Sequence, residues 1–206
     1  MSELPTRRNT NHVPQHDYSK PGQYFVTICV ENRKQLFGTI QNNEIVLNDI
    51  GNMIDFWWQE MFKKYKNIFI DQYVIMPNHI HGIINIVGAD LCIGPVQNNN
   101  INAIDNKNHI DSGKNIVLPL QYKELGQYIS WFKRMAANEY IKNVKNNNWP
   151  PFNKRLWQRN YYDHIIRNDR SLDRIRAYIA NNPKIWDNDI ENPNRIGNIE
   201  SELIKV

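Results

Sequence analysis

IFIDQYVIMPNHIHGIINIV, residues 68–87, contains two runs of apolar and β-branched residues separated by the tripeptide MPN. Each run has the length and composition of a strand, and a short connection with Pro and Asn is typical of a tight turn. We therefore predict two strands, over residues 68–75 and 79–87, that are antiparallel neighbours in one sheet.

The second predicted strand contains the motif His79-Ile80-His81. Side chains alternate between the two faces of a strand, so both imidazoles should point to one side and Ile80 to the other. Such a pair suits Mn or Zn, and Mg if phosphate oxygens complete the shell. The alternative is a pair of surface histidines. Two histidines rarely complete a site, so we also expect a third ligand: His109, His164, a carboxylate brought near by folding, or an amide.

The other elements follow from the same periodicities. We predict a strand over 24–30, a hairpin over 36–47, a helix that begins after the N-cap Asn48, a helix over 122–142, a strand over 161–166 and a helix over 171–181 that Pro183 ends. Strand, helix, strand, strand, helix, strand is the order of a ferredoxin-like or RRM-like βαββαβ fold, here with an extra C-terminal helix. We therefore predict an α+β protein with an antiparallel sheet and helices on one face.

The composition favours one globular domain over 1–206, with a core over about 18–186. The chain has 206 residues, of which 41% are apolar and 11% aromatic. Residues 88–118 are rich in Asn, Asp, Gly and Lys and read as a low-complexity insertion. No apolar run approaches the roughly 20 residues of a membrane span, the N-terminus resembles no secretory signal, and the two cysteines form no CxxC pattern. We expect a soluble, cytoplasmic protein.

The formal net charge of +4 favours polyanionic partners. Basic residues also alternate with aromatic ones, an arrangement that suits single-stranded nucleic acid because cations hold its backbone and rings stack on its bases. The alternative is a solvated basic surface above an aromatic core. The candidate phosphate contacts are Arg7, Arg8, Lys133, Arg134, Arg159 and Arg167.

The last predicted helix offers a second reactive group. Tyr178 and Asn182 are four residues apart, so a phenol and an amide should share one face of the helix. Pro183 follows directly and disfavours helical geometry at Asn182. The alternative for Tyr178 is a half-buried tyrosine at the edge of an apolar stripe. By chemistry alone, Tyr161 and Tyr162 are rival nucleophiles.

Four segments, in this order along the chain, resemble the IS200-like tyrosine transposases, and most closely the REP-associated branch. They are DYSKPGQYFVTICVENRKQLFG, MPNHIHGII, LWQRNYYDHIIRND and IRAYIANNP. The resemblance implies that His79 and His81 form the family's HUH metal site, that Tyr178 is the catalytic tyrosine and that Asn182, at a position often held by glutamine, completes the metal site. It also implies a divalent metal cofactor, Mg or Mn.

In such a family member, cleavage and rejoining of single-stranded DNA would pass through a 5′-phosphotyrosine at hairpin-bearing elements, in DNA transposition or repeat processing. The implied partner is single-stranded DNA with hairpin structure, and the REP-associated branch implies a nucleoid-associated monomer rather than a homodimer. One alternative is a DNA-hairpin-binding protein that no longer cleaves. Another is an unrelated metallohydrolase or nucleotidyl enzyme. These usually need further His or Asp ligands at close spacing, but the chain has no HxHxDH run and the next alternate residue is Ile83.

Overall fold

The computed structural model describes residues 17, 20–87 and 124–195. Its elements are β1 (Gly22–Cys29), the 3₁₀ turn η1 (Glu31–Arg33), β2 (Gly38–Gln41), β3 (Glu44–Leu47), α1 (Asp49–Lys64), β4 (Ile68–Ile75), β5 (His79–Ile86), α2 (Leu125–Asn146), β6 (Tyr162–Ile166), α3 (Asp169–Asn181) and the 3₁₀ helix η3 (Asn182–Asn188). Arg7, Arg8, His109 and the predicted insertion over 88–118 lie outside the described residues. Among the described helices, none is both long and apolar enough to span a membrane.

Four strands form the main sheet in the order β4-β5-β1-β6, and every neighbouring pair is antiparallel. The β2–β3 hairpin forms a separate two-stranded sheet and turns at Asn42 and Asn43, both in the left-handed region that asparagine tolerates. Without this hairpin the element order is βαββαβ. The ferredoxin-like prediction is confirmed.

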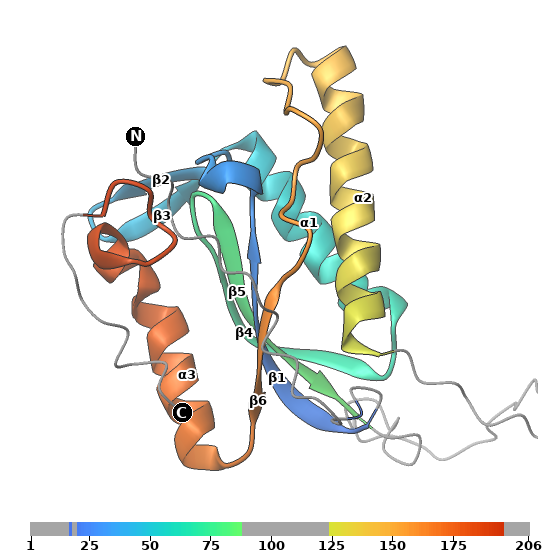
Figure 1. The fold of residues 1–206 in the computed structure, drawn as a ribbon, viewed down its shortest axis with the longest axis vertical. Helices are drawn as coiled ribbons and strands as arrows, with labels where there is room; N and C mark the ends of the chain where they lie inside the picture. The colour runs from blue at the N-terminus through green and yellow to red at the C-terminus, as the bar shows by residue number, and fades with distance from the viewer. Residues whose placement is uncertain (1–16, 18–19, 88–123, 196–206) are drawn as a thin grey trace, which may run out of the picture.

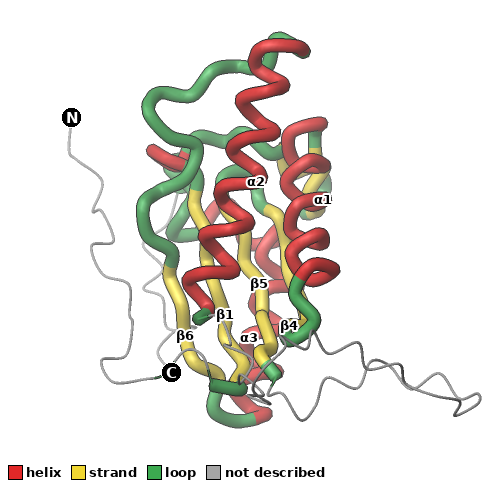
Figure 2. Tube along the Cα trace, turned by 90° about the vertical axis from the view of Figure 1, so that its right-hand side faces the viewer, coloured by secondary structure: helices red, strands yellow, loops and turns green. Residues whose placement is uncertain are grey.

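The two faces of the main sheet carry different helices (Figures 1 and 2). Helices α1 and α2 cover one face, where Ile80 and Ile84 of β5 enter the larger apolar core. Helix α3 lies on the other face, where Ile83 of β5 packs in a smaller cluster with Ile175 and Ile179. His79, His81 and Ile83 are alternate residues of β5, so their side chains lie on the same face of the sheet. The histidine pair therefore lies on the face that α3 covers.

Helix α3 begins where a polar cap satisfies its first turn: the side chain of Asn168 accepts a hydrogen bond from the Ser171 amide. It ends at Asn181, as predicted, but the chain remains helical. Asn182 has φ −56° and ψ −41°, so the expectation that Pro183 disfavours helical geometry there was wrong. Pro183 lies in the first turn of η3, where its missing N–H is not needed. The 3₁₀ helix then leads the chain to Asp189.

Candidate metal and tyrosine site

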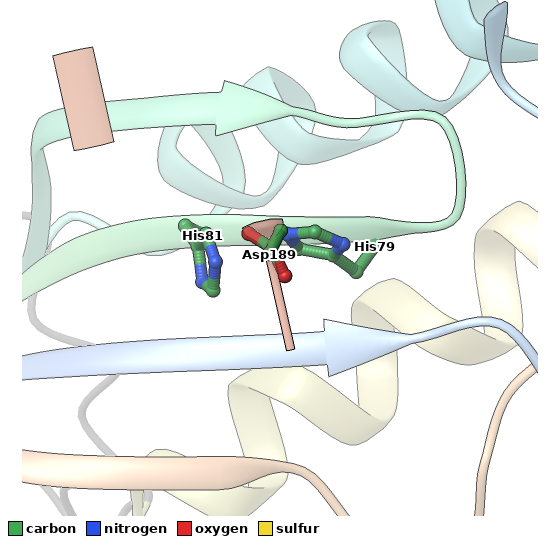
Figure 3. A group of neighbouring side chains, drawn as sticks. All are labelled: His79, His81 and Asp189. Carbon is green, nitrogen blue, oxygen red and sulfur yellow. The ribbon is translucent and has the colours of Figure 1, made fainter. Parts of the chain in front are cut away.

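Three buried side chains converge on the α3 face of the sheet (Figure 3). His79 and His81 are 0% and 2% exposed, and their ring centroids lie 4.4 Å apart. Asp189, which follows η3, is 4% exposed. One potential ligand atom from each of the three residues lies within 4.8 Å of the others. Two imidazoles and a carboxylate can hold a divalent cation, and this donor set suits Mn and similar borderline metals.

Asn182, the predicted third ligand, lies beside this cluster. Its buried Nδ2 donates a hydrogen bond to Oδ2 of Asp189 at 2.8 Å. The other carboxylate oxygen of Asp189 accepts from the Glu191 amide at 2.6 Å. Among the described residues, nothing donates a hydrogen bond to the buried Oδ1 of Asn182. The Asn182 amide thus holds the Asp189 carboxylate in place.

Tyr178 reaches the histidine pair from α3. Its hydroxyl lies 3.2 Å from Nε2 of His81, whose Nδ1 lies 2.8 Å from Oγ1 of Thr27. The ring of Phe25 stacks on His81 with a centroid distance of 5.3 Å and meets Tyr178 edge-on at 6.1 Å. Phe25 therefore supports both the imidazole and the phenol. On the other side of the site, Trp186 stacks on His79 at 6.1 Å.

An ion pair fixes α3 to the edge of the sheet. Nε and Nη2 of Arg176 donate to the two carboxylate oxygens of Asp71 at 2.8 and 2.6 Å. Asp71 lies where the pairing of β4 with β5 shifts register, between Ile70 and Tyr73. The bidentate geometry limits rotation of the helix about its axis, so the pair helps to hold Tyr178 against His81.

The rival residues occupy other places. Tyr162 meets Phe25 edge-on at 6.4 Å, so it lies on the site's face, but β1 separates its strand from the histidine strand. Tyr161 lines a cleft beside α2. His164 lies on β6, where desolvation and then the nearby Arg167 lower the pKa of its imidazole. The tyrosine whose hydroxyl lies against the histidine pair is Tyr178.

The predicted phosphate contacts separate into two groups. Lys133, Arg134 and Arg159 line an open cleft of about 870 Å³ on the α2 side of the sheet. Arg167 is exposed between β6 and α3. The cleft also contains Lys64 and three aromatic residues, Tyr65, Trp131 and Tyr161.

Lys133 also has a structural contact. Its ammonium donates to the carbonyl oxygens of Gln158, Arg159 and Asn160 at 2.7, 3.3 and 3.2 Å. Desolvation lowers the pKa of Lys133 to about 8. This side chain holds the segment before β6 in place, whereas Arg134 and Arg159 are exposed to solvent.

Sequence reasoning missed two residues of the site. Asp189 was covered only by the general expectation of a carboxylate brought near by folding, because nothing in its local sequence marks it as a ligand. Asn78 was assigned to the turn, yet its Oδ1 lies 2.8 Å from Nδ1 of His79. Its position next to a histidine pair is a signal that could have been used, because metal-binding histidines usually have a partner for the second ring nitrogen.

Comparison with known proteins finds a relative that matches most of this chain. No family model matches this chain. A Haemophilus influenzae protein described as uncharacterized is 32% identical over 187 residues, which cover 88% of this chain and 91% of the relative. The chain belongs to the same family as this protein.

Two solved structures are similar to this one. A REP-associated tyrosine transposase bound to a REP hairpin has a TM-score of 0.49 at 16% identity, over 84% of this chain and 72% of that chain. A Deinococcus radiodurans protein provisionally described as a transposase has a TM-score of 0.43 at 11% identity, over 81% and 93%. Both descriptions name the class of protein that the sequence motifs resemble.

Proposed function

We propose that this protein cleaves and rejoins single-stranded DNA through a 5′-phosphotyrosine at Tyr178, with a divalent cation, Mg or Mn, as cofactor. The observation that carries the proposal is the hydroxyl of Tyr178 at 3.2 Å from Nε2 of His81, within a buried cluster of potential metal ligands. A candidate nucleophile and a set of potential cation ligands thus lie next to each other in one chain. The motif order Tyr-Ile-x-x-Asn-Pro supports the same role for Tyr178.

His79, His81 and Asp189 would hold the cation, with Asn182 holding the carboxylate in place. A bound divalent cation would withdraw charge from the scissile phosphate and so lower the barrier to attack by an oxygen nucleophile. The protein supplies the orientation: Phe25 supports the phenol ring from the side, and the Arg176–Asp71 pair fixes the helix that carries it.

The covalent step exchanges one ester for another. The Oη of Tyr178 forms a bond to phosphorus, the bond between phosphorus and the 3′-oxygen breaks, the phenol loses its proton and the leaving oxygen gains one. The products are a 5′-phosphotyrosine and a free 3′-hydroxyl. Attack by a 3′-hydroxyl reverses the step. Because the ester bond is conserved, rejoining needs no nucleotide cofactor.

The cleft and α3 supply the surfaces for DNA. Exposed Arg134 and Arg159 stand beside Trp131 and Tyr161 in the cleft, a combination that suits a sugar-phosphate backbone and unstacked bases. On α3, Arg174 is exposed one turn before Tyr178 on the same side of the helix. We propose a hairpin-bearing single strand as the substrate, in transposition or repeat processing, and a nucleoid-associated monomer as the working form.

A covalent adduct assay tests the proposal. The protein is incubated with hairpin-bearing single-stranded DNA and Mg²⁺ or Mn²⁺, and adducts are separated on a denaturing gel. We expect a metal-dependent adduct with the wild type and with Tyr162→Phe, and none with Tyr178→Phe. An adduct that survives Tyr178→Phe, or no adduct with any hairpin and either metal, would exclude this function.

A second function, hairpin binding without cleavage, is favoured by one observation. The cleft lies on the α2 side of the sheet and the tyrosine site on the α3 side, so the cleft can bind DNA independently of the chemistry. This function predicts salt-dependent binding of folded single strands that Arg134→Gln and Arg159→Gln weaken, with no adduct in the presence of either metal. The adduct assay distinguishes the two functions.

A further inference from the structure

Asn78 joins three segments of the chain at the end of the histidine strand. Its side chain is fully buried, and its Nδ2 donates to the carbonyl oxygens of Arg33 at 3.1 Å and Glu191 at 2.7 Å. Its Oδ1 lies 2.8 Å from Nδ1 of His79. Its backbone carbonyl accepts from the amide of Val30 at 2.9 Å. One residue thus connects η1, the C-terminal segment and the first histidine of the pair.

The direction of these hydrogen bonds follows from the atoms. Carbonyl oxygens only accept, so the two contacts to Arg33 and Glu191 require the NH₂ group of Asn78 on that side. The oxygen of the amide must then face His79, and an amide oxygen also only accepts. Nδ1 of His79 therefore carries the hydrogen. In the neutral ring, the lone pair is left on Nε2, the atom that can bind a metal.

His81 has no such constraint from its two hydrogen-bonding neighbours. Its ring nitrogens face the hydroxyls of Thr27 and Tyr178, and a hydroxyl can donate or accept. Neither hydroxyl therefore sets the tautomer of His81, whereas the Asn78 amide sets the tautomer of His79 before any ion binds.

Asn78 also positions the carboxylate. The Glu191 carbonyl that it binds lies two residues after Asp189, and the Glu191 amide donates to Asp189 itself. The Glu191 side chain is buried and pairs with Arg33 at 2.9 Å. Glu191 is thus held through its backbone carbonyl by Asn78 and through its carboxylate by Arg33. Without the Asn78 contact, the segment that carries Asp189 would lose one of its buried anchors.

We propose that Asn78 is a positioning residue that prepares the metal site, by holding His79 in the Nδ1–H tautomer and by anchoring the segment of Asp189. The inference rests on the divalent metal site of the proposed function and on no step of DNA cleavage. Outer partners of metal ligands typically change metal affinity by about 10–100-fold, and Asn78 serves two ligands at once.

The first test is the metal-free wild type. ¹⁵N NMR of the histidine rings, with His79→Gln used to assign the signals, reports which nitrogen of His79 carries the hydrogen. We expect the Nδ1–H form. The Nε2–H form, or an even mixture, would overturn the inference, and the tautomer is read from the wild-type protein itself.

The second test compares variants by calorimetric titration with Mn²⁺. We expect Asn78→Ala to bind Mn²⁺ about 10–100-fold more weakly and to show a mixed tautomer at His79. The matched control is Asn67→Ala, which removes a 2.6 Å hydrogen bond to the hydroxyl of Tyr128 on the α2 side of the sheet. The control should bind Mn²⁺ as the wild type does.

Equal Mn²⁺ affinity in wild type and Asn78→Ala, or no Mn²⁺ binding by the wild type, would overturn the inference. Both readouts are made without DNA. If the wild type gives the expected tautomer and affinity but forms no DNA adduct, the DNA-cleaving function fails and the role of Asn78 stands.

Discussion

Replacement of Asp189 gives a prediction with a magnitude that follows from its hydrogen bonds. The carboxylate accepts from the Glu191 amide and from Nδ2 of Asn182. Asp189→Ala leaves both buried donors without an acceptor, and each such loss costs about 1–3 kcal/mol. Asp189→Asn keeps one carbonyl oxygen and loses one bond. We therefore expect the free energy of unfolding, measured in urea with a chelator present, to fall by about 2–6 kcal/mol for Ala and by about half of that for Asn.

The same two variants test the role of Asp189 in metal binding. A group that binds the ion directly should matter at least as much as an outer partner, so Asp189→Asn should weaken Mn²⁺ binding by at least about 10–100-fold in a calorimetric titration. Asp187→Asn is the matched control, because Asp187 is exposed on η3. The control should change neither stability nor Mn²⁺ affinity.

Two results would refute this reasoning. Wild-type Mn²⁺ affinity in a folded Asp189→Asn protein would show that the carboxylate does not bind the ion. Equal stability of the Asn and Ala variants would show that the two hydrogen bonds do not determine the cost of the substitution.

Three further predictions concern other parts of the molecule. Because Tyr178 and His81 of one chain form the site together, a mixture of Tyr178→Phe and His81→Ala proteins should form no DNA adduct on a denaturing gel; restored activity would show that two chains share a site. Desolvation lowers the pKa of Lys133 from 10.5 to about 8. Between these two pH values the unfolded chain holds the proton of Lys133 more tightly than the folded chain does. The free energy of unfolding should therefore rise with pH in this range, by at most about 3 kcal/mol. Urea titrations at several pH values should show this rise in the wild type and not in Lys133→Met. An equal rise in the two proteins would show that Lys133 is not the group whose pKa is lowered. A Cβ at Gly82 would lie 2.6 Å from Cζ2 of Trp58, so Gly82→Ala should cost about 1–3 kcal/mol in urea unfolding, and Trp58→Phe in the same chain should recover part of it; an additive loss in the double variant would argue against the clash.

The fold could be predicted from the sequence because its signals are local. The apolar runs over 68–87 predicted β4 and β5, and the alternation of side chains along a strand predicted the common face of His79 and His81. Asn48 marked the start of α1, where its side chain accepts from the Gly51 amide. A period of two or of 3.6 residues survives in any tertiary context as long as one face is buried.

The remainder of the site depends on contacts between distant segments. Asp189 reaches His79 only because η3 continues past Pro183 and because Asn78 and Arg33 hold Glu191. None of these contacts leaves a pattern in the local sequence. The roles of Asn182 as a ligand and of the arginines as phosphate contacts stay predictions.

Strand β6 links the cleft directly to the tyrosine site. The residues just before it, Arg159 to Tyr161, line the cleft, and the helix that follows it carries Tyr178 on the opposite face. Its five residues span about 17 Å at 3.3 Å per residue. If one DNA strand occupies both surfaces, this length acts as a molecular ruler between recognition and cleavage. An insertion of two residues in β6 would keep the inward and outward faces of the strand and add about 7 Å, so the cut would move to a different nucleotide while the recognised hairpin stayed the same.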